Sequence, residues 1–150
     1  MSERRSVYSG SPWEKRVAYC RATRVGHVVA VSGTVASDEN GTVVGPGDVY
    51  VQAKFALEKI RTALAELGAM PEDVIRTRSF LVDITRFEEF ARAHKEMFDG
   101  IDPAASAVEV SRLIAPQFLI EIEADAVIDA PLVDLASADR ASVNRASADR

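Results

Sequence analysis

Apolar and polar residues alternate most clearly between residues 120 and 128. The run reads Ile120, Glu121, Ile122, Glu123, Ala124, Asp125, Ala126, Val127, Ile128. Successive side chains of a strand point to opposite faces, so this pattern predicts a strand with one face in a core and three carboxylates on the other. The carboxylate row has two interpretations: a solvated sheet face, which the pattern alone favours, or the lining of a cleft.

A second alternating run precedes this strand at residues 103–113. In it Ser106 and Val108 fall on one face and Ala107 and Glu109 on the other. A turn containing Pro116 joins the two runs. We therefore expect them to form a hairpin around which the rest of the chain is organised.

The amino-terminal third predicts an arm followed by strands. Residues 1–15 have little sign of regular structure. Residues 16–24 and 27–32 predict two strands that meet at Gly26, where a tight turn favours a residue tolerant of positive φ. The DENG sequence at residues 38–41 then predicts another turn.

Two stretches have apolar residues at helical spacing. They predict amphipathic helices over residues 49–67 and 86–98. Asp48 is placed to cap the first helix, and Thr85, three residues before a glutamate, predicts a capping box for the second. His94 lies on the apolar stripe of the second helix, where a structural role is more common than a catalytic one.

A strand over residues 74–83 is predicted between the helices. Its Arg76 and Arg78 share a face. They could be solvated charges or partners of the carboxylate row, and a role in binding an anion is less favoured. The order of strands, helix, strand, helix and two strands predicts an α+β fold, with two helices on one face of a mixed sheet. The other face carries small residues, valines and scattered charge, which predicts a homo-oligomer.

The 150 residues predict one domain over residues 16–130, followed by a different tail at 131–150. Residues 136–150 are three consecutive copies of a five-residue repeat, ASADR, ASVNR and ASADR. Such a repeat buries little apolar surface and cannot offset its ordering entropy. We expect the tail to lie outside the domain and to be mobile in solution.

Charge and composition narrow the function classes. The formal net charge is −5 without a basic run, which argues against a nucleic-acid partner. Cys20 is the single cysteine, so an internal disulfide is excluded. The sequence contains neither a signal-peptide pattern nor a membrane-length apolar run, and no metal-ligand spacing links Cys20, His27 and His94. These features predict a cytoplasmic protein without a membrane partner.

Residues 12–128 resemble the Rid family of reactive-intermediate or imine deaminases, also called YjgF-like or endoribonuclease L-PSP-like proteins. The resemblance rests on Tyr19, the VSG at 31–33, the PA-x-S-x-VEV-x-RL pattern at 103–113 and the IEIEADA at 120–126. It implies a chorismate-mutase-like α+β fold, a homotrimer and ligand clefts between subunits. It also implies a small-molecule ligand, and no metal or organic cofactor.

The same resemblance implies roles for individual residues. Many members hydrolyse enamines or imines, such as 2-aminoacrylate, to the keto acid and ammonia. At the matching positions, Glu121 orients the attacking water, and Tyr19, Ser32 and Gly33 complete the pocket. The other positions matched to the family's ligand-binding pattern are Ala105, Ser106, Ala107 and Arg112.

Ala105 is the largest departure from the family pattern, because deaminating members have a carboxylate-binding arginine there. Each hydrogen bond to a charged group is typically worth about 1.5–3 kcal/mol, and an alanine methyl supplies none. Either Arg76 or Arg112 replaces that arginine, or the ligand is not an α-imino acid and the cleft suits a neutral, less polar ligand. A hydrolase is therefore favoured only slightly over a non-catalytic metabolite-binding module, and both are favoured over RNA cleavage.

Overall fold

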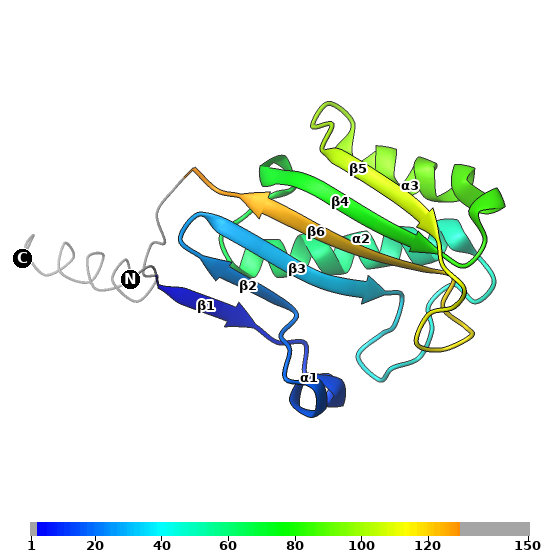
Figure 1. Ribbon diagram of the computed structural model, residues 1–150, viewed down its shortest axis with the longest axis horizontal. Helices are drawn as coiled ribbons and strands as arrows, with labels where there is room; N and C mark the ends of the chain where they lie inside the picture. Colours follow the sequence, from blue (N-terminus) through cyan, green and yellow to red (C-terminus); the bar gives the residue numbers. More distant parts are fainter. Residues whose placement is uncertain (1–2, 130–150) are drawn as a thin grey trace, which may run out of the picture.

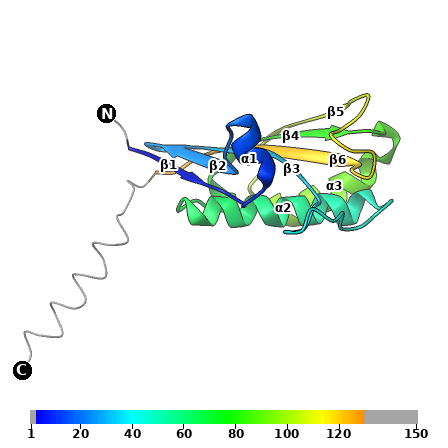
Figure 2. The same cartoon turned by 90° about the horizontal axis from the view of Figure 1, so that it is seen from below.

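The computed structural model describes residues 3–129, which form a mixed α+β domain around one six-stranded sheet (Figure 1). The strand order is β1-β2-β3-β6-β4-β5. Figure 2 shows α2 and α3 on one face of this sheet. The elements are β1 (Arg4–Val7), α1 (Pro12–Val17), β2 (Ala22–Val25), β3 (Val28–Val35), α2 (Val49–Glu66), β4 (Val74–Leu81), α3 (Phe87–Phe98), β5 (Ala104–Glu109) and β6 (Ile120–Val127). The predicted tail at 131–150 lies outside the described residues.

Strand β6 is central, because it pairs antiparallel with both β3 and β4. Its alternation is confirmed. Ile120, Ile122 and Ala126 are fully buried against the helices, while Glu121 and Glu123 lie on the opposite, outer face. One strand therefore contributes both to the core and to the row of carboxylates.

The prediction that β5 and β6 form a hairpin is wrong. Strand β4 lies between them, pairing parallel with β5 and antiparallel with β6. Parallel neighbours require a crossover connection, and α3 supplies it between β4 and β5. The loop at residues 110–119 then carries the chain past β4 to the centre of the sheet.

Both predicted helices are present with small differences at their ends. The Asp48 carboxylate accepts the Val51 backbone N–H at 2.8 Å, as predicted for the cap of α2. The prediction of a capping box at Thr85 is wrong. Asp83 instead accepts from the backbone and hydroxyl of Thr85, and the short 3-10 turn Ile84–Arg86 precedes α3.

The amino-terminal segment is more ordered than expected. Residues 1–15 were predicted to lack regular structure, but β1 extends the sheet by pairing with β2, and α1 follows. The buried Glu14 carboxylate accepts the backbone N–H groups of Ser9 and Gly10, which fixes the loop before α1. The strand predicted from residue 16 begins only at Ala22.

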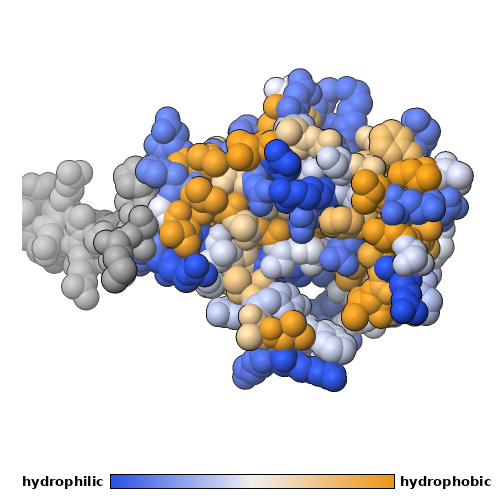
Figure 3. All heavy atoms as spheres, in the orientation of Figure 1, coloured by the Kyte–Doolittle hydropathy of each residue, from blue (hydrophilic) through white to orange (hydrophobic). Residues whose placement is uncertain are grey.

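The outer face of the sheet, opposite α2 and α3, carries Val28, Val127 and the β6 carboxylates. Figure 3 views this face, where apolar and hydrophilic surfaces lie side by side. Arg78 on β4 donates to Glu123 at 2.9 Å and to Asp125 at 3.2 Å. Of the three interpretations of Arg78, pairing with the carboxylate row is confirmed. Across residues 3–129, no helix combines the length and apolar character needed to cross a membrane.

Replacing Ile122 with alanine tests the packing of β6. Ile122 is fully buried, so its truncation should lower the free energy of unfolding by about 2–5 kcal/mol. Ile75→Ala on β4 is the matched control, because 54% of the Ile75 side chain is exposed and such a site should change stability by only about 0.5 kcal/mol. Urea unfolding measures both, and equal effects would contradict this packing.

Candidate functional site

A β-bulge interrupts β3 at the VSG sequence. The pairing with β6 shifts register between Val31 and Thr34, so Ser32 and Gly33 form the irregular step. The Ser32 hydroxyl donates to the Cys20 carbonyl at 2.8 Å. That bond uses the hydroxyl hydrogen, so the Ser32 oxygen is left as an acceptor for a ligand. Bulges of this kind often re-aim side chains beside active sites.

Gly33 lies directly beneath the Glu121 carboxylate. A Cβ atom at position 33 would stand 1.9 Å from Glu121 Oε1, well inside van der Waals contact. The glycine is therefore needed for the observed position of this carboxylate. Among the described residues, Glu121 forms no ion pair, whereas Glu123 and Asp125 both pair with Arg78.

Arg21 completes this cluster, and it was missed at the sequence level. Its Nη2 donates to the Gly33 carbonyl at 2.6 Å, while its Nε is buried and has no hydrogen-bond partner among residues 3–129. Burial raises the pKa of Glu121 above its usual range, and the positive charge of Arg21 partly offsets that rise. The sequence did contain a signal for Arg21. It follows Tyr19 by two residues, and residues spaced by two lie on the same face of an extended segment.

Burial lowers the pKa of Arg21, and the electrostatic influence of Tyr19, two residues earlier in the chain, opposes that shift. Tyr19, Arg21, Ser32, Gly33 and Glu121 therefore form one region, which we call the carboxylate cluster. Arg112 does not belong to it by any observed contact. It is exposed on the loop between β5 and β6.

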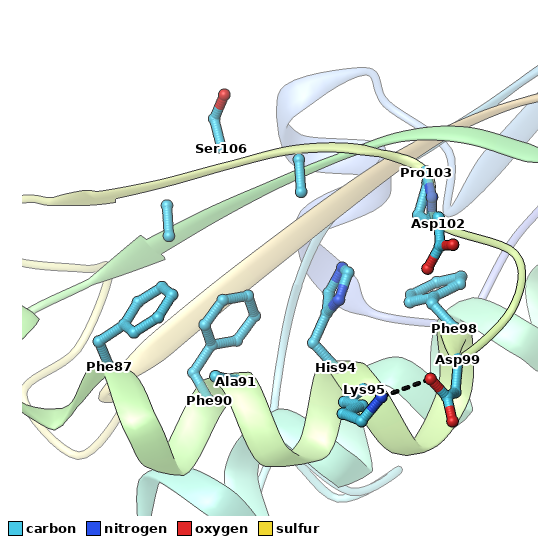
Figure 4. A pocket seen from close by; sticks show the side chains of 12 residues that line it. Phe87, Phe90, Ala91, His94, Lys95, Phe98, Asp99, Asp102, Pro103 and Ser106 are labelled. Atoms are coloured by element: carbon cyan, nitrogen blue, oxygen red, sulfur yellow. Dashed lines mark hydrogen bonds and ion pairs between the residues drawn. The ribbon is translucent and has the colours of Figure 1, made fainter.

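A second region lies between α3 and β5, where a pocket of about 510 Å³ opens (Figure 4). Ala105 and Ala107 line it from β5. Ser106 is also part of the lining, but its side chain points away from α3. We call this the α3–β5 pocket; its full lining is Phe87, Phe90, Ala91, His94, Lys95, Phe98, Asp99, Asp102, Pro103, Ala105, Ser106 and Ala107.

Four rings along α3 form one wall of the pocket. Ring centroids are 5.7 Å apart for Phe87 and Phe90, 5.4 Å for Phe90 and His94, and 4.7 Å for His94 and Phe98. His94 Nε2 is 2.9 Å from the hydroxyl oxygen of the buried Thr77. The expected structural role of His94 is thus supported by a hydrogen bond.

The charges around the pocket are mostly acidic. Lys95 is the one cation among the described lining residues, and its ammonium pairs with Asp99. Asp102 adds a second carboxylate to the lining of the pocket (Figure 4). Neither Arg76 nor Arg112, the two candidates to replace the missing arginine, lines the pocket.

The carboxylate cluster and the α3–β5 pocket lie on opposite faces of the sheet. Glu121 is on the outer face, whereas Ala105 and Ala107 line the pocket and pair with the buried Thr77 and Ser79 of β4, which places them on the α3 side. One ligand cannot contact both regions within a single chain. Across residues 3–129, no group of three or more His, Cys, Asp and Glu side chains could hold a metal ion.

A family model described as "Endoribonuclease L-PSP" matches residues 11–128. The chain belongs to this family, which is also known as the YjgF, RutC or Rid family. An uncharacterized Streptomyces coelicolor protein is 38% identical over 122 residues, which cover 81% of this chain and 90% of that protein. The 3-aminoacrylate deaminase RutC of Acinetobacter baylyi is 36% identical over 104 residues, covering 69% and 82%.

Two solved structures share this fold. The crystal structure of Rv2704 from Mycobacterium tuberculosis aligns with a TM-score of 0.77 and 43% identity, covering 84% of this chain and all of that one. E. coli TdcF with bound serine aligns with a TM-score of 0.68 and 28% identity, covering 82% and 93%. The sequence resemblance to the Rid family is thus confirmed, and the α+β fold agrees with these structures.

Substitution of Gly33 by alanine tests the contact with Glu121. The new methyl should displace the carboxylate toward solvent, because the carboxylate is the mobile end of a flexible side chain. We expect the pKa of Glu121, followed by NMR titration, to fall from its raised position toward the ordinary 4.5. In a Glu121→Ala background the same substitution should cost no further stability. An unchanged Glu121 titration in Gly33→Ala would contradict this contact.

The buried position of His94 predicts a pH dependence of stability. Burial lowers the pKa of His94 below 6.5, so the unfolded chain binds its proton more readily than the folded one. The stabilisation from neutral His94 is complete above about pH 6.5 and is lost as the pH falls toward the lower, folded pKa. Urea unfolding should therefore show a steeper loss of stability as the pH falls below about 6.5 in the wild type than in His94→Gln. Parallel losses in both proteins would refute the prediction.

Proposed function

We propose that this Rid-family protein is a cofactor-independent hydrolase of imines or enamines. The observation that carries the proposal is the environment of Glu121. This carboxylate is half-buried, has a raised pKa and forms no ion pair among the described residues, although the next acid along the same face is paired. A carboxylate held in this way is suited to take a proton from water.

The reaction needs one water and one proton carrier. Glu121 accepts a proton as the water oxygen attacks the C=N carbon of the protonated imine, and the electron pair of the double bond moves to nitrogen, which gives a neutral carbinolamine. Glu121 then returns this proton to the amino nitrogen. The C–N bond breaks and ammonia leaves as the C=O bond forms, and Glu121 takes up the proton that the hydroxyl loses. Tyr19, Ser32 and the Gly33 backbone orient the ligand in this proposal.

The proposed site forms between subunits of a homotrimer. The carboxylate cluster of one subunit meets the α3–β5 pocket of its neighbour. In this way one ligand can contact both regions, although within one chain they lie on opposite faces of the sheet. The uncovered outer face, with exposed Val28 and Val127, supports such an assembly. A head-to-tail contact of this kind closes into a ring when its rotation permits.

A metabolite-binding protein without turnover is the second candidate. Ala105 favours it, because the described pocket lining offers no unpaired cation in place of the arginine. RNA cleavage, which the family description suggests, has less support. The outer face carries carboxylates, and the net charge is −5, which is unfavourable for contact with phosphates.

A comparison of Glu121→Gln with Glu123→Gln tests the hydrolase proposal. Both substitutions remove one carboxylate from the same face of β6, but only Glu123 pairs with Arg78. Imines generated in situ by a separate oxidase are the substrates, and ammonia release is followed against the uncatalysed rate. Loss of a general base should reduce acceleration by about 10²–10⁴-fold in Glu121→Gln, with little change in Glu123→Gln.

The pH dependence gives a second readout of the same experiment. A general base acts only when deprotonated, so the rate should fall on the acid side at a pKa above the ordinary 4.5 of glutamate. Equal effects of the two substitutions, or no acceleration by the wild type with any imine, would overturn the hydrolase proposal.

A further inference from the structure

We propose that the α3–β5 pocket selects imines that derive from primary amines, carry an aromatic or branched apolar group and lack an α-carboxylate. This inference rests on the proposed hydrolase function and names the substrate class of that site. Its basis is the combination of an aromatic wall, an acidic end and the absence of an unpaired cation among the described lining residues.

The size and walls of the pocket fit an apolar group. A volume of about 510 Å³ lies within the usual range for small-molecule sites, about 300–1,000 Å³. Phe87 is 41% exposed and offers ring surface along α3, with Phe90 and Phe98 buried behind it, and Ala105 and Ala107 keep the opposite wall low. An aryl or branched alkyl group can lie between these walls, where a long side chain at position 105 would take up the space.

The charges of the pocket disfavour a carboxylate ligand. Among the described lining residues, Lys95 is already paired with Asp99, so an entering carboxylate would meet Asp102 without an unpaired lining cation. In the proposed composite site, Arg21 of the neighbouring carboxylate cluster already donates to the Gly33 carbonyl. Like charges brought together at a binding site favour the competing ligand that lacks the charge. A protonated imine carries the opposite charge and suits both Asp102 and the faces of the aromatic rings.

His94 does not add a positive charge to the pocket. Its ring is neutral at pH 7 because burial lowers its pKa, and its Nε2 is engaged with Thr77. It contributes ring surface between Phe90 and Phe98 rather than a positive charge. The other charged groups that line the pocket are Lys95, Asp99 and Asp102.

The chemistry of such a substrate defines the reaction that supplies it. A primary amine oxidised by O₂ through an amine oxidase gives R–CH=NH₂⁺ and hydrogen peroxide from R–CH₂–NH₃⁺. Hydrolysis then adds water and gives the aldehyde and ammonium. The protein would act directly after an amine-oxidising enzyme, before the reactive imine meets other nucleophiles.

A matched pair of substrates tests the inference. Amine oxidase and phenylethylamine give the imine without a carboxylate, and L-amino acid oxidase and phenylalanine give the same phenyl skeleton with one. The acceleration of ammonia release by the wild type should be at least about tenfold greater for the first imine, equivalent to about 1.4 kcal/mol. A greater acceleration of the phenylalanine-derived imine would overturn the inference while leaving the hydrolase proposal intact.

Two variants test whether the pocket causes the preference for the imine without a carboxylate. Ala105→Arg should reverse it, because the guanidinium supplies the carboxylate-binding fork. Asp102→Asn should reduce it by removing the negative charge, and asparagine tolerates the positive φ of 52° at this position. A preference that both variants leave unchanged would overturn the assignment to this pocket.

A binding measurement distinguishes a wrong substrate class from a wrong hydrolase proposal. Phenylethylamine and 3-phenylpropionate have similar phenyl skeletons and opposite charges, and calorimetry gives their affinities without turnover. Stronger, Asp102-dependent binding of the amine with no imine hydrolysis would support the pocket's selectivity and reject the hydrolase. Equal or stronger binding of the carboxylate would overturn the inference.

Discussion

The pairing of β6 with both β3 and β4 determines where the important groups of this protein lie. Because β6 is antiparallel to both neighbours, its register fixes the apolar residues toward α2 and α3 and the carboxylates toward the outer face. A shift of one residue would exchange the two sets. The core and the chemistry of the sheet therefore depend on the same backbone hydrogen bonds.

Glu121 and Glu123 show how one strand produces two kinds of carboxylate. Glu123 lies opposite Arg78 in the register of β4 and β6, and their side chains form an ion pair. Glu121 instead lies over Gly33 at the bulge of β3, near Arg21. Partial burial raises the pKa of Glu121 because its charge loses solvation. The bulge thus converts one member of a charged row into a candidate base.

Much of this fold was predictable because its signals are local. The alternation at residues 120–128 and the Asp48 cap each depend on neighbouring residues. The position of β4 between β5 and β6 was not predictable in this way, since strands distant in sequence pair through the packing of α3. The helix after Ser11 was missed because its six residues carry little periodicity, although a serine before a proline is a helix-start signal.

The family pattern named residue types for the candidate site but did not give their geometry. Ser32, Gly33 and Glu121 come from that pattern, and in the structure the VSG and IEIEA segments that carry them occupy neighbouring strands. The pattern did not reveal Arg21, whose role depends on the carbonyl of Gly33. Nor did it show that Ala105 and Ala107 face α3, which follows from the parallel register of β4 and β5.

In the proposed assembly, one site combines Glu121 from one subunit with the α3–β5 pocket of another. The most direct measurement mixes two inactive proteins, Glu121→Gln and a pocket-filling Ala105→Trp, after reversible dissociation. If subunits exchange at random in a head-to-tail trimer, about one quarter of the sites regain both intact halves, so about one quarter of wild-type imine hydrolysis should return. A mixture that forms hybrid trimers, shown by native mass spectrometry, and stays inactive would contradict the shared site.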